Sequence, residues 1–302
     1  MVVCIIPRMM TSSYGKLKEL LTKERPIPSQ FVFTHNCNKP LSVYNKIALQ
    51  INAKMGGTLW FAQLPQEMPS NSIVIGMDVF HDTRKGSRSV LGICSTIDSN
   101  LTKYYNQVAF HKPRQEIADT LGELCIKSFK AYYRQCGRKP DNIFIFRDGV
   151  GDSQFKTVAD YEFPQIIRKI QEFDRAWSPK FTIVVVNKRV NTRFFAGTGN
   201  PQPGTLINKD VVGKHYNFYL LSHAAGRGTA TPTHYNVVYD NSGLPSNLLE
   251  NLTYRLCFNY YNWNGAIKVP APCQNAHKLA YLVGKYTQVD FSEKIAKNYF
   301  YL

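Results

Sequence analysis

Two apolar runs of strand length, each carrying an aspartate, constrain the fold of this chain most. Asp78 interrupts IVIGMDVF, which begins at Ile73, and Asp148 ends IFIFRD directly before Gly149. A carboxylate in or at the end of a buried strand must be hydrogen-bonded, ion-paired or metal-bound, because burying it unpaired costs several kcal/mol. The two runs therefore predict neighbouring central strands that share a polar site.

Each of these polar residues also has a purely structural interpretation. An aspartate at a strand end can be a cap or an ion-pair member, and Arg147 stands directly beside Asp148 as a possible partner. His277, behind the turn PAPC, could be a satisfied histidine on a helix. His81 and His234 lie near the predicted site strands without an obvious partner. The residues alone leave these alternatives open.

Apolar periodicity along the chain predicts alternating strands and helices. Pro65, Pro69, Ser70 and Asn71 mark a boundary, so we expect one unit at residues 1–70 and another at 71–302. The first unit has the order β, helix, β, helix. The second begins with three strands, then a long helix, a strand ending in an acid and another helix, which predicts an α/β fold with a mixed sheet flanked by helices. The predicted strands are 2–6, 31–34, 72–80, 89–96, 102–109, 142–147, 181–187 and 234–239, and the predicted helices are 114–136, 154–172, 245–261 and 274–284.

The charge balance indicates a polyanionic partner. The 302 residues include 37 Lys and Arg against 21 Asp and Glu, a formal net charge of +16, while 44% apolar residues exclude wholesale disorder. Nucleic acid is the commonest such partner, and an acidic membrane surface is the rival. No apolar run approaches the ~20 residues of a membrane-spanning helix, so we expect no membrane partner.

The cysteines and the N-terminus bear on where the protein resides. Seven cysteines without a CxxC pair favour reduced structural thiols over disulfides or a zinc site. No secretory signal is present, so we expect an intracellular protein. A strand that begins at residue 2 has no preceding element to pair with, which suggests a fragment of a longer protein.

The acidic residues suit two-metal phosphodiester hydrolysis, in which ions about 3.5 to 4 Å apart hold the attacking water and the leaving oxygen. Carboxylate oxygens are ligands that Mg²⁺ and Mn²⁺ prefer. Asp78 and Asp148 could share one ion, and His277 could join the second.

Six motifs carry a family resemblance that goes further. In order along the chain they are IGMDVFHD, RDGVGDSQF, VNTRFF, TPTHYNVVYDNSGL, LTYRLC with NYYNW, and PAPCQNAHKLAYLVG. Together they resemble the Piwi domain of the Argonaute superfamily, in its Piwi clade. The resemblance implies an RNase H-like fold for residues 71–302 and a slicer site made of Asp78, Asp148, His277 and a glutamate. Glu116 in RQEIADTL matches the glutamate best, with Glu123 as the fallback.

Two residues depart from the family pattern beside the implied catalytic positions. Ser153 stands where the family usually has glycine in GDGQ, and Asn275 stands where a tyrosine is common. Neither replaces a catalytic residue.

Residues 1–70 resemble the later part of the Mid domain, which in this family holds the 5′ phosphate of a guide strand. Tyr14 and Lys18 are four residues apart, as are Gln50 and Lys54, so each pair shares a helical face. Amide and ammonium donors suit a phosphate, and an aromatic ring suits the first base. In the Piwi clade a glutamine replaces a lysine and a metal bridges the phosphate to the terminal carboxylate. The implied phosphate site is Tyr14, Lys18, Gln30, Gln50, Lys54 and Leu302, although the lysines could simply solvate helix faces.

The resemblance implies binding of a small guide RNA (piRNA) and Mg²⁺- or Mn²⁺-dependent cleavage of complementary target RNA. Gene or transposon silencing in the germline would be the outcome, with other silencing proteins as partners. Two alternatives remain: a guide-loaded module that silences without cutting, and a nuclease of this fold without a guide. The expected location is the cytoplasm, including perinuclear granules, with the nucleus as the alternative. A backbone channel would be lined by Lys188, Arg189 and Arg193 together with Lys16, Lys18, Lys46 and Lys54. Arg147 and Arg189 could instead be internal ion-pair partners.

Overall fold

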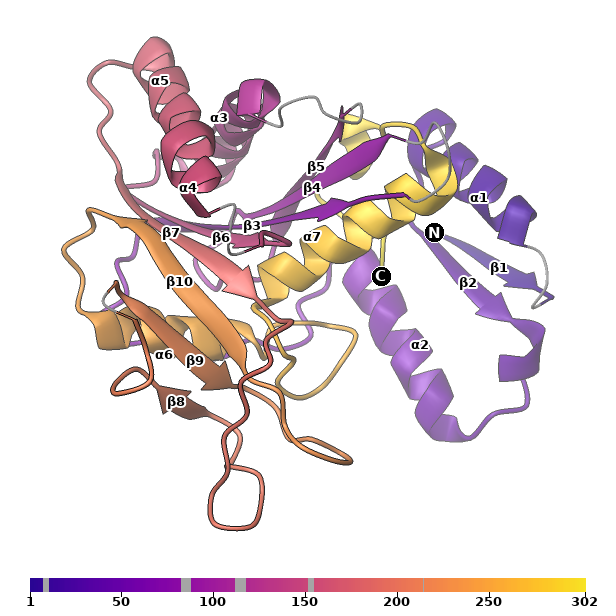
Figure 1. Cartoon of the computed structure of the whole chain (residues 1–302). Coiled ribbons are helices and arrows are strands. Elements are labelled where there is room, and N and C mark those ends of the chain that lie inside the picture. The colour runs from indigo at the N-terminus through magenta and orange to yellow at the C-terminus, as the bar shows by residue number, and fades with distance from the viewer. Residues whose placement is uncertain (8–10, 83–87, 112–117, 152–154, 214) are drawn as a thin grey trace.

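The computed structural model describes residues 1–7, 11–82, 88–111, 118–151, 155–213 and 215–302. Within them, the chain forms an α/β structure with two sheets (Figure 1), as the sequence predicted. The strands are β1 (Val2–Ile6), β2 (Ser29–Phe33), β3 (Ser72–Phe80), β4 (Ser89–Thr96), β5 (Tyr104–His111), β6 (Asn142–Asp148), β7 (Lys180–Asn187), β8 (Thr205–Ile207), β9 (Asn217–Leu221) and β10 (Thr233–Asp240). The helices are α1 (Thr11–Glu19), α2 (Leu41–Lys54), α3 (Ala118–Cys136), α4 (Phe155–Thr157), α5 (Phe163–Phe173), α6 (Ser246–Leu256) and α7 (Ala271–Leu282).

The larger sheet is mixed and has the strand order β5-β4-β3-β6-β7-β10-β9-β8. Its centre is parallel, since β6 pairs in parallel with both β3 and β7. The outer pairs are antiparallel. Parallel neighbours end at the same edge of the sheet, so the ends of β3 and β6 that carry the two aspartates lie together.

Alternate residues of the central strands face two separate cores. Ile73, Ile75 and Met77 pack in the core that α3 and α5 cover, whereas Val74 packs with Cys273 in the core that α6 and α7 cover. Figure 1 shows these helix pairs on opposite faces of the sheet. Because side chains alternate along a strand, Asp78 shares the face of Val74, and Asp148 shares the face of Phe144 and Phe146, both of which belong to that second core.

The first seventy residues form a smaller unit around the parallel pair β1 and β2. Its order, β1, α1, β2, α2, is the predicted one. It packs against the C-terminal residues, because Ala53 of α2 shares a core with α7 residues and with Tyr299 and Phe300. The division into Mid and Piwi domains at residue 70 stays a prediction.

Several element boundaries differ from the predicted ones for identifiable reasons. Strand β5 begins at Tyr104 instead of residue 102, because the amides of Thr102 and Lys103 bind the Asp98 carboxylate in a turn. Helix α7 begins at Ala271, so PAPC is its first turn, where Pro272 loses no helical hydrogen bond. The short strands β8 and β9 were not predicted. Predicted helix residues 114–117 lie outside the described residues.

Two further sequence expectations concern cysteines and membranes. All seven cysteines are described, and each is free, as expected. Among the described residues, no helix combines the length and the apolar character needed to cross a bilayer.

Candidate functional site

The two aspartates of the apolar runs lie side by side at one edge of the sheet. Met77 pairs with Arg147 across β3 and β6, so Asp78 and Asp148 follow at equivalent positions. Both side chains face α7 and both residues are buried, with 4% and 1% exposure. Two carboxylates so placed repel each other, and they require positively charged or hydrogen-bonding neighbours.

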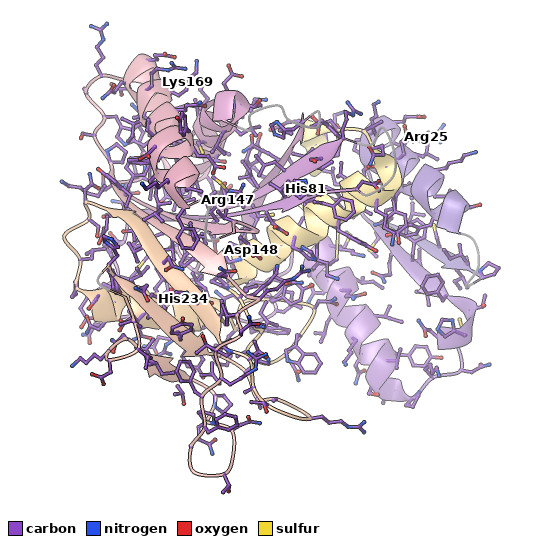
Figure 2. All side chains as sticks on the ribbon, viewed as in Figure 1. Arg25, His81, Arg147, Asp148, Lys169 and His234 are labelled. Atoms are coloured by element: carbon purple, nitrogen blue, oxygen red, sulfur yellow. The ribbon has the colours of Figure 1, made fainter. Side chains whose placement is uncertain are left out.

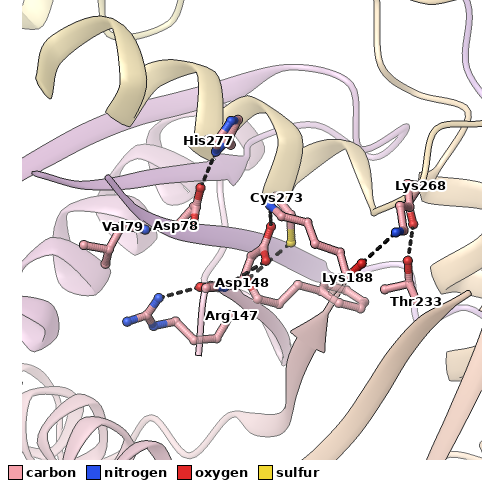
Figure 3. A network of polar contacts seen from close by, with 11 residues as sticks. Asp78, Val79, Arg147, Asp148, Lys188, Thr233, Lys268, Cys273 and His277 are labelled. Carbon is pink, nitrogen blue, oxygen red and sulfur yellow. Dashed lines mark hydrogen bonds and ion pairs between the residues drawn. The ribbon is translucent and has the colours of Figure 1, made fainter. Parts of the chain in front are cut away.

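His277 on α7 supplies one neighbour. Its Nδ1 lies 2.6 Å from Asp78 Oδ2 (Figure 3). The helix approaches β3 this closely because residue 76 is glycine: a Cβ there would lie 2.1 Å from the carbonyl carbon of Pro272. The sequence prediction that brings Asp78, Asp148 and His277 together at one place therefore agrees with the geometry, and their catalytic roles stay a prediction.

Lys188 supplies the other neighbour, directly after β7. Its Nζ lies 2.6 Å from Asp148 Oδ2, and the backbone amide of Gly149 donates to Asp148 Oδ1. Burial raises the pKa of the Asp148 carboxyl; Lys188 opposes this effect, and the negative charge of Asp78 adds to it. Gly149 has a φ of +79°, and a Cβ there would lie 2.8 Å from Asp78 Oδ1, so the turn after Asp148 requires glycine.

Arg147, the neighbour that the sequence offered to Asp148, has a different partner. Its side chain forms a buried ion pair with Glu162, with Nε 3.2 Å from Oε2, and donates to the backbone oxygen of Asp148. Adjacent residues of a strand point to opposite faces, which keeps this guanidinium away from the Asp148 carboxylate. His81 contacts Ser89, and His234 contacts Asn217. Figure 2 shows where these two histidines and Asp148 lie.

The residues partly fit a divalent cation. Two buried carboxylates on adjacent strands form a hard oxygen site, and the Lys188 ammonium already stands in for a cation on Asp148. Within the described residues, however, no three His, Cys, Asp or Glu side chains form a metal-ligating cluster. Glu116 lies outside the described residues. The fallback Glu123 is exposed on α3, the helix that packs on the opposite face from α7.

A second candidate site is a cavity of about 340 Å³ between the N-terminal unit and α7. All six residues of the predicted phosphate site line it: Tyr14, Lys18, Gln30, Gln50, Lys54 and Leu302. They come from α1, β2, α2 and the C-terminus. The structure therefore brings this predicted set together, although its ligand stays a prediction.

Two buried lysines give this cavity its charge. Lys54 Nζ donates to the backbone oxygen of Ser29 and to Gln30 Oε1, at 3.2 and 2.8 Å, and Lys18 Nζ donates to the backbone oxygen of Phe300 at 2.8 Å. Burial lowers the pKa of Lys18 to about 8. Burial, followed by the charge of Lys18, lowers the pKa of Lys54 to about 6. An anion in the cavity would raise both pKa values and so favour the charged form of each lysine.

Amide side chains continue this network. Gln30 Nε2 donates to Gln50 Oε1 at 3.1 Å, and Gln50 donates in turn to Asn262. Tyr14 is held by edge contacts with Phe31 and Tyr286, each with ring centroids 4.9 Å apart. The donors that surround the cavity are therefore fixed in place before any ligand binds.

Sequence reasoning missed part of both sites. Lys278, Tyr281 and Leu282 of α7 also line the cavity. The sequence shows that these residues follow His277 on one helix, but it does not show which side of that helix faces the cavity, because tertiary packing decides this. Lys188 was assigned only to a nucleic-acid channel, whereas the structure places it on Asp148. The other two residues of that predicted set, Arg189 and Arg193, are exposed.

The chain matches a known protein family along most of its length. The model of the Piwi domain matches residues 1–288. Piwi-like protein 1 of Danio rerio is 41% identical over 293 residues, which cover 94% of this chain and 34% of that protein. The chain thus spans about a third of the length of this relative.

Solved structures have the same fold. The crystal structure of Drosophila Piwi matches with a TM-score of 0.91 and 32% identity, over 100% of this chain and 42% of that one. Kluyveromyces polysporus Argonaute, crystallised with a guide RNA, matches with a TM-score of 0.88 over 99% of this chain and 41% of that one. At 22% identity, the second match shows the fold alone.

Proposed function

Because the chain belongs to the Piwi domain family of Argonaute proteins, we propose that it binds a small guide RNA by its 5′ phosphate and cleaves complementary target RNA. The cavity between α1, α2 and α7 would hold the phosphate, and the edge of the sheet at Asp78 and Asp148 would hold the scissile bond of the target. Base pairing would select the sequence, as it does in other guided systems.

The observation that carries this proposal is the pair of buried lysines at the cavity. Lys18 and Lys54 are each 2% exposed, and among the described residues no acidic side chain lines the cavity with them. Protonating both buried amines is costly when no acidic side chain lies beside them, and a phosphate would offset that cost with charge-assisted hydrogen bonds.

Cleavage is supported by the acidic site. Asp78 and Asp148, with His277 beside them, would hold Mg²⁺ or Mn²⁺, and such a cation would stabilise charge on the phosphate oxygens. The chain itself contributes two positioned carboxylates, and α7 keeps the imidazole in contact with Asp78. Glu116 is proposed to complete the site.

The first experiment tests the guide. A single-stranded RNA with a 5′ phosphate should bind the full chain more tightly than the same strand with a 5′ hydroxyl. Loss of two charge-assisted hydrogen bonds at about 1.5 kcal/mol each corresponds to roughly a hundredfold difference. Equal affinities for the two strands would refute the proposal.

The second experiment tests cleavage. Asp78→Ala and Asp148→Ala should each abolish Mg²⁺-dependent cutting of a target complementary to a loaded guide, while 5′-phosphate discrimination stays unchanged. Undiminished cutting in either variant would exclude the catalytic assignment. Wild-type chain that binds the guide without cutting would favour the alternative, a silencing module that acts by recruiting partner proteins.

The biological setting is proposed from the family alone. As part of a longer Piwi protein, the chain would use piRNAs to silence transposons in the germline, in the cytoplasm or the nucleus. Sequencing of the RNA that copurifies with the tagged full-length protein, with imaging of its location, tests both points.

A further inference from the structure

Lys188 occupies the place on Asp148 that a metal ion would need. Its Nζ lies 2.6 Å from Asp148 Oδ2, a distance typical of a strong charge-assisted hydrogen bond. The Asp148 side chain is 2% exposed, so few of its oxygen lone pairs can reach other ligands. Repulsion between the ammonium and a divalent cation would weaken metal binding at this oxygen.

The backbone of Lys188 is fixed, whereas its side chain can move. The backbone oxygen of Lys188 accepts a hydrogen bond from Lys268 Nζ at 2.6 Å, and the Lys268 oxygen accepts one from Thr233 at 2.8 Å (Figure 3). The Lys188 side chain is 29% exposed, and its four-carbon stem turns readily. The ammonium can therefore leave Asp148 for the surface without any change in the sheet.

Lys268, which binds the backbone of Lys188, lies near other positive charges. Burial has the largest effect on the pKa of Lys268 and lowers it, and the positive charges of the exposed Arg193 and of Lys188 lower it further. Without a polyanion, these charges repel the Lys188 ammonium toward Asp148. An RNA backbone beside them would draw the Lys188 ammonium away from Asp148, because its phosphates attract all three side chains.

We propose that Lys188 is an internal counter-ion that closes Asp148 to metal in the RNA-free chain and releases it when the ammonium turns to an RNA phosphate. RNA binding and metal binding are then coupled, and linkage makes the coupling reciprocal: RNA raises the affinity for metal, and metal raises the affinity for RNA. Lys188 acts here as a positioning residue. The inference rests on the proposed function, which supplies the RNA and the metal.

The first test measures Mn²⁺ binding to the whole chain without RNA, by titration calorimetry. Lys188→Met and Lys188→Gln should bind Mn²⁺ at least about tenfold more tightly than wild type, since no charge-assisted hydrogen bond has to be broken. Lys188→Arg, which keeps the charge, should stay near wild type. Lys180→Met is the matched control, because it removes the same charge at the opposite, exposed end of β7 and should change nothing.

Asp148→Asn locates the effect, since it should remove the gain when combined with Lys188→Met. Circular dichroism confirms that each variant is folded, and the two Lys188 replacements guard against a defect peculiar to one of them. Equal Mn²⁺ affinity in wild type and in both folded Lys188 variants would overturn the proposal.

The second test adds a 5′-phosphorylated RNA with 2′-O-methyl groups, which resists cleavage. RNA should raise the Mn²⁺ affinity of wild type several-fold and should raise that of Lys188→Met much less. An equal RNA effect in both proteins would overturn the coupling. Failure of the RNA to bind through its 5′ phosphate would instead count against the proposed function, while the RNA-free comparison still decides whether Lys188 closes Asp148.

Discussion

Replacing Lys54 with methionine should stabilise the free chain and at the same time remove its preference for 5′-phosphorylated RNA. Lys54 is 2% exposed. Its pKa is lowered to about 6, mainly by burial and to a smaller extent by the positive charge of Lys18. In the unfolded chain the same group has its ordinary pKa of 10.5. Between these two values the unfolded chain binds a proton that the folded chain does not hold, so protonation of Lys54 favours unfolding.

The size of the effect follows from the same two values. From pH 7 to the unfolded pKa is about 3.5 pKa units, and at about 1.4 kcal/mol each this sets an upper limit near 5 kcal/mol. Methionine also leaves the backbone oxygen of Ser29 and the amide oxygen of Gln30 without this donor, which costs about 1 kcal/mol each. We therefore expect Lys54→Met to stabilise the chain by up to about 3 kcal/mol at pH 7.

The sign of the pH dependence separates this explanation from a simple gain in packing. A lowered lysine pKa gives a penalty that is greatest near pH 6 and fades as the pH rises toward 10.5. Urea unfolding of wild type and Lys54→Met at pH 6.5, 7.5 and 9 should show a shrinking advantage that is nearly gone at pH 9. Lys39→Met, at an exposed position, is the control, and its free energy of unfolding should equal that of wild type at all three pH values. A constant difference, or a less stable variant at pH 6.5, would refute the reasoning.

Two further predictions concern the surroundings of the aspartates. Arg147→Met leaves Glu162 as an unpaired buried charge and should cost about 3 to 5 kcal/mol in urea unfolding, whereas the exposed Arg168→Met should change stability by less than about 1 kcal/mol. A loss under 1 kcal/mol at Arg147 would contradict this. Gly149→Ala places a side chain at a positive φ beside Asp78, so it should lower the free energy of unfolding by at least about 1 kcal/mol and slow cleavage. An unchanged melting temperature and an unchanged cleavage rate would contradict this prediction.

The sheet was predictable because its central strands carry their information locally. The apolar runs in β3 and β6 are long and are flanked by polar or turn-forming residues. The sequence places an aspartate toward the same end of both. Period-two alternation then fixes the face of every side chain. Strand β8 has only three residues, too few to show an alternating pattern in the sequence.

Helical spacing correctly indicated which residues of the cavity lie together, whereas their role in phosphate binding stays a prediction. Tyr14 with Lys18 and Gln50 with Lys54 share helix faces, and the structure places both pairs at the cavity. The charge partners of the aspartates were harder to predict. Lys188 is separated from Asp148 by 40 positions, and only the pairing of β6 with β7 brings them together.

One helix connects the two candidate sites. His277 of α7 contacts Asp78, while Lys278, Tyr281 and Leu282 of the same helix line the cavity. The packing of α7 on β3, through Gly76, keeps it in a single position. Helices of this length are rigid, so the separation between a phosphate in the cavity and the aspartates cannot vary much. Under the proposed function, a guide held by its 5′ end would pass the acidic site at a constant number of nucleotides from that end, so the cut in the paired target would fall at a constant position whatever the RNA sequence.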